Sequence, residues 1–303
     1  MPRPVPLPES LPASGFTIAK ARQQGVTRAR TRSRDWEAPF YGIRVKAGTR
    51  DLRGRAMAYA AGMPPSQFFS HTTAARLHGL RMPQGFHETE LHVTSLAPAR
   101  APRGAGVVGH QADRATVAMV GSLRVRSAVE TWCQLSAQLD LDNLVVMGDG
   151  LVRRNSPLAS MTQLRDAAFH HSGRGCRKLR AALDAVRPGT DSARESMLRM
   201  IVLRAGFPEP EVNGVILNSY GAEIAHGDLV FRRYRTILEY EGRQHSQDVR
   251  QFAIDISRLD ELMEEGWRVI RVDQALLARR ATLIGKVDRA LRDGGWNPSA
   301  APK

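Results

Sequence analysis

Hydrophobic and polar positions follow their clearest pattern near the C-terminal end of the chain. Two apolar runs, at residues 229–231 and 236–238, flank a polar break at residues 232–235. Short apolar runs on either side of a polar turn predict a β-hairpin. We therefore expect two antiparallel strands here, with the turn centred between Arg233 and Tyr234.

The predicted hairpin brings carboxylates together. With this turn, Asp228 lies directly opposite Glu239, and the two-residue period of a strand places Glu241 on the same face. Opposed like charges, with Cβ atoms roughly 5 Å apart, destabilise a sheet. A hard cation such as Mg²⁺ or Mn²⁺ would remove this penalty, because it binds carboxylate and backbone carbonyl oxygens. In the alternative, the register is shifted by one residue and the acids form a solvated edge.

Apolar residues at helical spacing precede the hairpin. The segment from Ser192 to Glu195 is a capping box, and apolar positions continue at helical spacing as far as Ala205, before Gly206 and Pro208 end the helix. The segments that follow predict a strand at 212–217, a turn at 218–221, a strand ending near Asp228, the hairpin, a helix at 246–265, a strand at 267–272 and a final helix. We expect an α-β-β-β-α-β-α domain over residues 190–296.

The middle of the chain, residues 56–187, alternates between the two patterns and predicts a mixed α/β region. Helices are expected at 70–80, 127–138 and 141–154, and strands at 90–94 and 123–126. Five histidines lie in or near this part: His71, His78, His87, His92 and His110. Their spacing fits no ligand pattern such as two histidines three to five residues apart on one helix, so we expect polar packing residues. Asp140, Asp142 and Asp149 are expected to be helix-capping and surface acids.

Residues 1–55 predict a winged helix-turn-helix. A helix at 16–24, a turn at Gly25, a second helix at 27–35 and a strand at 40–45 follow the order of that motif, whose second helix enters a DNA major groove. Candidate DNA-binding arginines lie on the second helix and on the wing: Arg28, Arg30, Arg32, Arg34 and Arg44. The first four alternate every second residue and would surround the helix, so only some could face a groove. The alternative is a small helical pair with a solvated arginine face.

Composition narrows the class of protein. The apolar fraction of 42% is that of a globular chain, and no apolar run approaches the roughly 18 residues of a membrane span. The first eight residues are too rich in proline for a signal peptide, so we expect a cytoplasmic protein with no membrane association. Cys133 and Cys176 imply no disulfide framework. The net charge of +14 attracts polyanions and makes nucleic acid the expected partner, without distinguishing DNA from RNA.

The N-terminal half resembles the abortive-infection type antitoxin family, in which a winged helix precedes a mixed α/β region. The resemblance is carried by segments 16–25, 41–45, 70–80, 91–94 and 121–127. It implies DNA binding and a possible cognate toxin as partner.

The C-terminal domain resembles the PD-(D/E)XK nuclease core, and more closely the family related to very-short-patch-repair endonucleases. Five motifs occur in order: Glu195-Ser-x-x-Arg199, Gly206-Phe-Pro-x-Pro210, Gly227-Asp-Leu229, Glu239-Tyr-Glu-Gly-x-x-His245, and the segment from Asp255 to Arg271. The resemblance implies a restriction-endonuclease-like fold and a magnesium-dependent nuclease.

The resemblance assigns roles to the acids. Asp228 and Glu239 would hold Mg²⁺, with the Tyr240 carbonyl as a possible third ligand. Glu195 would orient the attacking water, unless it serves only as the capping-box residue that binds the Ser192 amide.

The resemblance also assigns roles to residues around the acids. His245 would act as general acid or base, the alternative being an exposed loop histidine. Arg258 and Arg271 would neutralise phosphate or pair with Asp255. Glu241 occupies the position where most members of the fold class have lysine; the repair endonucleases lack it too, so the general base is unassigned.

Two functions from different classes follow. The first is a Mg²⁺-dependent DNA endonuclease in repair or in defence against foreign DNA, alone or with a repair partner. The second is a DNA-binding transcriptional regulator of antitoxin type, whose nuclease-like domain is inactive and serves for binding or oligomerisation. An RNA substrate is a third possibility. Target, type of cut and oligomeric state are not determined by these patterns.

Overall fold

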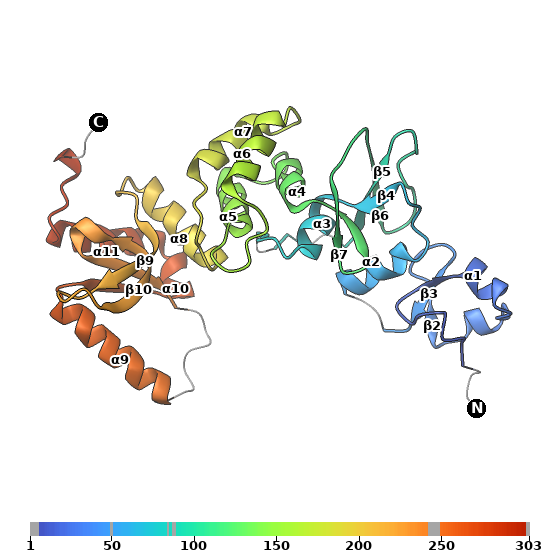
Figure 1. Cartoon of the computed structure of the whole chain (residues 1–303), viewed down its shortest axis with the longest axis horizontal. Coiled ribbons are helices and arrows are strands. Elements are labelled where there is room, and N and C mark those ends of the chain that lie inside the picture. The colour runs from blue at the N-terminus through green and yellow to red at the C-terminus, as the bar shows by residue number, and fades with distance from the viewer. Residues whose placement is uncertain (1–5, 49–50, 84, 87–88, 242–248, 301–303) are drawn as a thin grey trace. The chain divides into compact units, whose positions relative to one another are not determined.

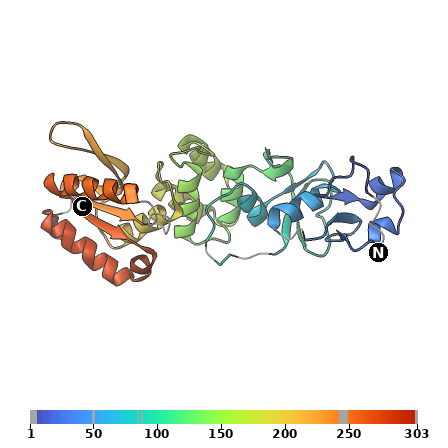
Figure 2. The same cartoon turned by 90° about the horizontal axis from the view of Figure 1, so that it is seen from below.

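The computed structural model describes residues 6–48, 51–83, 85–86, 89–241 and 249–300, with backbone alone for 249–256 and 300. The described chain is a mixed α/β protein that forms two compact units (Figures 1 and 2). One unit contains residues 1–139 and 167–176, and the other contains 140–166 and 177–303. Among the described helices, none is both long and apolar enough to cross a membrane.

The first unit begins with a three-stranded antiparallel sheet in the order β1-β3-β2. Its strands are β1 (Phe16–Thr17), β2 (Trp36–Glu37) and β3 (Ile43–Lys46), and helix α1 (Ile18–Gln23) follows β1 directly. Thr17 caps α1 by accepting a hydrogen bond from the Lys20 amide, and Gly25 adopts the left-handed conformation of the expected turn. The first helix and the strand of the predicted motif are therefore present, in shortened form.

The predicted second helix at 27–35 is wrong, because only a three-residue 3-10 turn, Arg30–Arg32, forms there. Local side-chain bonds compete with helical ones at this point. The Arg30 guanidinium binds both carboxylate oxygens of Asp35 at 2.9 Å, and Thr31 donates to the Arg28 carbonyl. Ser33 also accepts from Arg30 and closes the turn. The described residues 6–48 therefore contain no recognition helix.

A five-stranded mixed sheet in the order β6-β5-β4-β8-β7 completes the first unit. β5 pairs in parallel with β6, and β4 in parallel with β8. Buried residues such as Phe69, Leu91, Val93 and Val125 form its core. The elements are α2 (Leu52–Ala60), β4 (Gln67–Phe69), α3 (His71–Leu77), β5 (Leu91–Leu96), β6 (Val107–Ala112), β7 (Val117–Val120), β8 (Leu123–Arg126) and α4 (Ala128–Leu135).

Helices occupy the segment before the last domain. They are α5 (Leu141–Leu151), α6 (Met161–His170) and α7 (Cys176–Ala185), and α8 (Ala193–Arg204) then begins the last domain. Asp140 caps α5 as expected, accepting from the Asn143 amide, and Asp142 lies at the surface against Arg204. Asp149 is not a surface acid. It is completely buried and pairs with Arg199 of α8 at 2.9 Å, because a helix that packs against α5 supplies a partner fifty residues away.

A four-stranded sheet in the order β12-β11-β10-β9 forms the centre of the last domain. Its strands are β9 (Glu211–Leu217), β10 (Glu223–Phe231), β11 (Thr236–Tyr240) and β12 (Arg268–Val272). Helix α9 (Val249–Glu264) lies between β11 and β12 in sequence, and α10 (Gln274–Ala278) and α11 (Arg280–Asp293) follow. The element order predicted for residues 190–296 is therefore confirmed from α8 to β12, and the single final helix of the prediction is two helices, α10 and α11.

Helices cover both faces of this sheet. On one face, Leu229, Phe231 and Leu238 share a core with α8, α10 and α11. On the other face, Val230 and Ile237 share a core with Leu262 of α9 (Figure 2). Alternating residues of the hairpin thus enter two different cores, as strand geometry requires.

Candidate active site and basic cleft

The hairpin has the register expected from its sequence. Leu229 pairs with Leu238 and Phe231 pairs with Thr236, so the next residues along the two strands are Asp228 and Glu239. The Tyr240 amide donates to Asp228 Oδ2 at 2.7 Å across the strands. Arg235 closes the turn in the left-handed conformation, with φ of 45°. The alternative of a register shifted by one residue is therefore wrong.

Asp228 occupies an unusual electrostatic environment. The pKa of its carboxyl is raised to about 7, chiefly by burial and also by the negative charges of Glu195, Glu239 and Asp191, against the opposing effect of the Tyr240 amide. Three other acids therefore lie close enough to Asp228 to act on its charge.

Glu239 is paired with an arginine. Its Oε1 atom lies 2.5 Å from Nη2 of Arg258 on α9, and only 12% of its side chain is exposed. Burial raises the pKa of Glu239, while Arg258 and Arg271 act in the opposite direction. Glu241, further along the same face, is more exposed and pairs with Arg271 of β12 at 3.0 Å. Glu239 and Glu241 therefore each have an arginine partner.

Glu195 takes part in the cap of α8 and also lies near Asp228. Its amide donates to Ser192 Oγ at 3.1 Å, which is half of the predicted capping box. The returning bond differs from expectation, because Glu195 Oε2 accepts from the Asp191 amide at 2.8 Å and not from Ser192. The carboxylate turns toward β9, where Asn213 Nδ2 lies 3.5 Å away. It is 7% exposed and close enough to Asp228 to raise the pKa of that residue.

Two predicted participants lie outside the part of the chain that the structure describes. His245 falls within residues 242–248, and the side chain of Asp255 falls within 249–256. The expected pairing of an arginine with Asp255 is therefore untested, although Arg258 and Arg271 have the partners named above. Tyr240 is the last residue of β11, and its amide contacts Asp228. The Tyr240 carbonyl is the group expected as a third ligand of Mg²⁺.

Asp191 was not singled out from the sequence. It precedes the cap of α8, binds Arg154 through an ion pair, and is a third acid that raises the pKa of Asp228. A capping box predicts a helix start but not which strand that start approaches, so the sequence held no signal for this contact.

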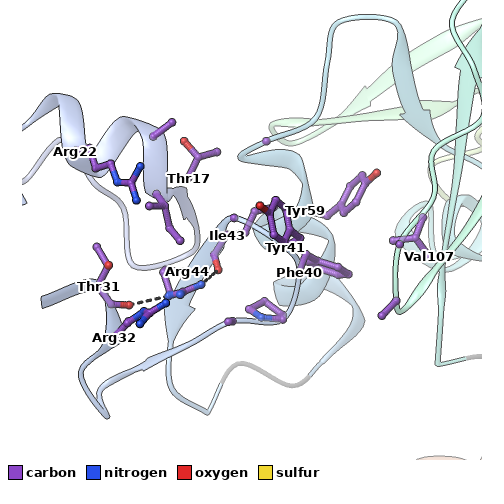
Figure 3. A pocket seen from close by; sticks show the side chains of 18 of the residues that line it. Thr17, Arg22, Thr31, Arg32, Phe40, Tyr41, Ile43, Arg44, Tyr59 and Val107 are labelled. Carbon is purple, nitrogen blue, oxygen red and sulfur yellow. Dashed lines mark hydrogen bonds between the residues drawn. The ribbon is translucent and has the colours of Figure 1, made fainter. Parts of the chain in front are cut away.

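The first unit contains a cleft of about 1020 Å³ between the N-terminal segment and residues 103–107. Figure 3 shows Arg22, Arg32 and Arg44 around it, together with Tyr41 and Phe40. Arg44 is held by a 2.7 Å hydrogen bond from Nε to the Thr31 carbonyl, and the Tyr41 ring is fully exposed. The arginines that line it are Arg22, Arg28, Arg32, Arg44 and Arg103.

The cleft divides the predicted DNA-binding arginines. Arg28, Arg32 and Arg44 line it, whereas Arg30 is bound to Asp35 and Arg34 is exposed elsewhere. This surface combines positive charge with aromatic rings. Positive charge attracts the phosphates of any nucleic acid, and aromatic rings can stack with the bases of a single strand. Comparison of the chain with protein-family models, curated proteins and solved structures found no match.

Proposed function

We propose that the C-terminal domain is a Mg²⁺- or Mn²⁺-dependent endonuclease of the PD-(D/E)XK, restriction-endonuclease-like class that hydrolyses DNA phosphodiester bonds. One observation carries the proposal: two half-buried carboxylates, Asp228 and Glu239, lie opposite each other on neighbouring strands. Such a pair destabilises a sheet unless a proton or a cation lies between the charges.

The donor atoms fit a hard divalent cation. Asp228 and Glu239 offer carboxylate oxygens, and the carbonyl of Tyr240 follows on the same strand. Asp228 uses Oδ2 for the Tyr240 amide and Glu239 uses Oε1 for Arg258, and each carboxylate has a second oxygen to contribute. When bound, the cation would stabilise charge on the phosphoryl oxygens and favour ionisation of the attacking water.

The neighbouring residues would orient the substrate and the water. Glu195 reaches the site from the start of α8, where its carboxylate could accept a hydrogen bond from the attacking water. Arg258 and Arg271 would turn from the acids of β11 toward a phosphate once a cation neutralises those acids. Glu241 would remain the partner of Arg271 in the absence of substrate. The basic cleft would supply affinity for DNA.

The test is cleavage of supercoiled plasmid and of mismatched duplex with Mg²⁺ or Mn²⁺. The variants Asp228→Asn and Glu239→Gln keep side-chain shape and remove charge, and Glu223→Gln on β10 is the matched control because Glu223 is exposed and contacts only His226 among the ion pairs of the described residues. We expect the first two to abolish nicking at unchanged DNA affinity. Equal cleavage by all four proteins would assign the activity to a contaminant and reject this site.

A second function is favoured by the ion pairs of Glu239 and Glu241. Arg258 and Arg271 neutralise these two acids, as expected of a nuclease-like domain that no longer cleaves. The chain would then be a DNA-binding regulator of antitoxin type. Tight binding to a specific operator, with no cleavage in either metal, would favour this function.

A further inference from the structure

Three histidines that are far apart in sequence meet in the first unit. His71 begins α3, and His92 and His110 lie on the parallel neighbours β5 and β6. One ring nitrogen of each lies within 4.8 Å of those of the other two. His92 Nδ1 is 3.0 Å from His110 Nε2, and the rings of His71 and His110 are stacked with centroids 3.8 Å apart. These three histidines are therefore clustered and not scattered.

Surrounding groups hold the rings in place. Ser70 Oγ lies 3.0 Å from His71 Nδ1 and accepts from Thr94 Oγ1 at 2.8 Å. A hydroxyl can accept two hydrogen bonds, so it can bind Nδ1–H of His71 and leave Nε2 with the lone pair. The His71 backbone, at φ of 49°, donates its amide to Gln134 Oε1. This conformation is uncommon for a residue with a side chain and fixes the direction of the ring.

The three imidazoles are shielded from solvent, since His92 is buried and His71 and His110 are half-buried. Arg126 lies close enough for its positive charge to act on the His71 ring. Neutral imidazole is the form that binds metal ions. Arg126 would repel a cation, but it is paired with Glu130 at 3.2 Å, which reduces that effect. The oriented hydroxyl at Nδ1 matches the outer hydrogen bonds that hold metal-binding histidines.

We propose that His71, His92 and His110 form a Zn²⁺ site with three imidazole ligands and a fourth position open to water or to a ligand. Three nitrogen donors suit a borderline cation better than Mg²⁺, which prefers oxygen. In a tetrahedral site with Zn–N distances of about 2.0–2.1 Å, ligand nitrogens are separated by about 3.3 Å. The 3.0 Å separation of His92 Nδ1 and His110 Nε2 is close to this value. His71 is stacked on His110, so its ring would turn out of the stack to direct a nitrogen lone pair at the metal.

The experiment titrates chelator-treated, tag-free full-length protein with Co²⁺, whose visible absorption reports tetrahedral nitrogen ligation, and then displaces it with Zn²⁺. We expect one Co²⁺ per chain in this absorbing site. His92→Ala and His110→Ala are expected to lower affinity at least about 100-fold, and Ser70→Ala by about 10- to 100-fold. His78→Ala is the matched control, because its ring binds the Arg126 carbonyl and lies outside the cluster.

Two further measurements separate this site from the acids of the C-terminal domain and from general unfolding. The double variant Asp228→Asn/Glu239→Gln should keep the Co²⁺ spectrum. Zn²⁺ should raise the Tm of the parent and the His78→Ala variant but not of His110→Ala, whose half-buried position makes it the less disruptive substitution. A parent protein without the Co²⁺ spectrum, or a His110→Ala variant that is folded by circular dichroism and retains it, would overturn the proposal.

Discussion

The acids of the C-terminal hairpin and the histidines of the first unit are both clusters of ionisable side chains, but the two clusters are assembled in different ways. Asp228 and Glu239 come from strands joined by a short turn, whereas His71, His92 and His110 come from three elements spread over forty residues. Both sets are packed closely enough for their pKa values to shift, toward protonation in Asp228 and toward the neutral form in His71. The two sets differ in the donor atoms that they offer, oxygens suited to a hard cation in the acids and nitrogens suited to a borderline cation in the histidines.

The largest expected effect is the loss of one property, plasmid cleavage or the Co²⁺ spectrum, when one of the two sites is mutated and the other is left intact. Asp228→Asn should lower plasmid cleavage by about 10³-fold or more while leaving the Co²⁺ spectrum unchanged. His92→Ala should remove that spectrum and leave cleavage within about twofold when corrected for folded protein. Measuring both properties on both variants checks this. Loss of both properties in either folded variant would contradict two independent sites.

Asp149, unlike Asp228, is a buried acid with an arginine partner, so removal of that partner should lower the free energy of unfolding. Arg199→Met would leave Asp149 buried and unpaired in α5, so we expect a loss of about 3–5 kcal/mol in the free energy of unfolding. Asp149→Leu/Arg199→Met should recover much of this loss, because an apolar pair replaces the ion pair. Urea unfolding of the three proteins measures both values. A loss below about 1 kcal/mol in the single variant would show that the pair contributes little.

Stability should depend on pH through Asp228. The folded state binds the proton with a pKa of about 7, above the ordinary value of 3.8, so stability falls as pH rises between these values. Asp228→Asn, which mimics the protonated form, should lack this fall and be more stable than the parent by on the order of 1–2 kcal/mol near pH 8. Urea unfolding across this range tests the sign, and identical pH profiles for the two proteins would contradict it.

Mg²⁺ should stabilise the folded protein at the pH values at which Asp228 has lost its proton. Because a cation competes with the proton on Asp228, Mg²⁺ should raise the Tm of the parent at about pH 8 and have little effect at about pH 5. Thermal scans of parent and Asp228→Asn, each with and without Mg²⁺, measure this. An equal rise in both proteins at both pH values would indicate non-specific binding.

The smallest effect concerns the basic cleft. Arg32 lines it, and Arg34, two residues later, is equally exposed but lies outside it. Arg32→Ala should weaken DNA binding several-fold and reduce the slope of log affinity against log salt by about 1. Arg34→Ala should change neither quantity measurably. Fluorescence anisotropy at several salt concentrations makes the comparison, and equal losses would favour a diffuse electrostatic attraction over a defined cleft.

Local pattern alone was sufficient where the decisive interactions are close in sequence. Alternation around residues 232–235 predicted the register of β10 and β11, and with it the opposition of Asp228 and Glu239. The order of elements in the C-terminal domain followed in the same way from periodicity and caps. The helix expected at 27–35 failed for an equally local reason, because Arg30, Ser33 and Asp35 bind one another more favourably than they continue a helix.

Tertiary packing decided which distant residues meet. The sequence determined that His92 and His110 lie on strands, but the parallel pairing of β5 with β6 and the packing of α3 brought them to His71. It determined a cap at Ser192, while the approach of α8 to β9 and β10 placed Glu195 and Asp191 beside Asp228. The pattern that predicts a helix or a strand is a property of residues close in sequence. The burial of a site residue and the charges around it depend on elements that only the folded chain places together.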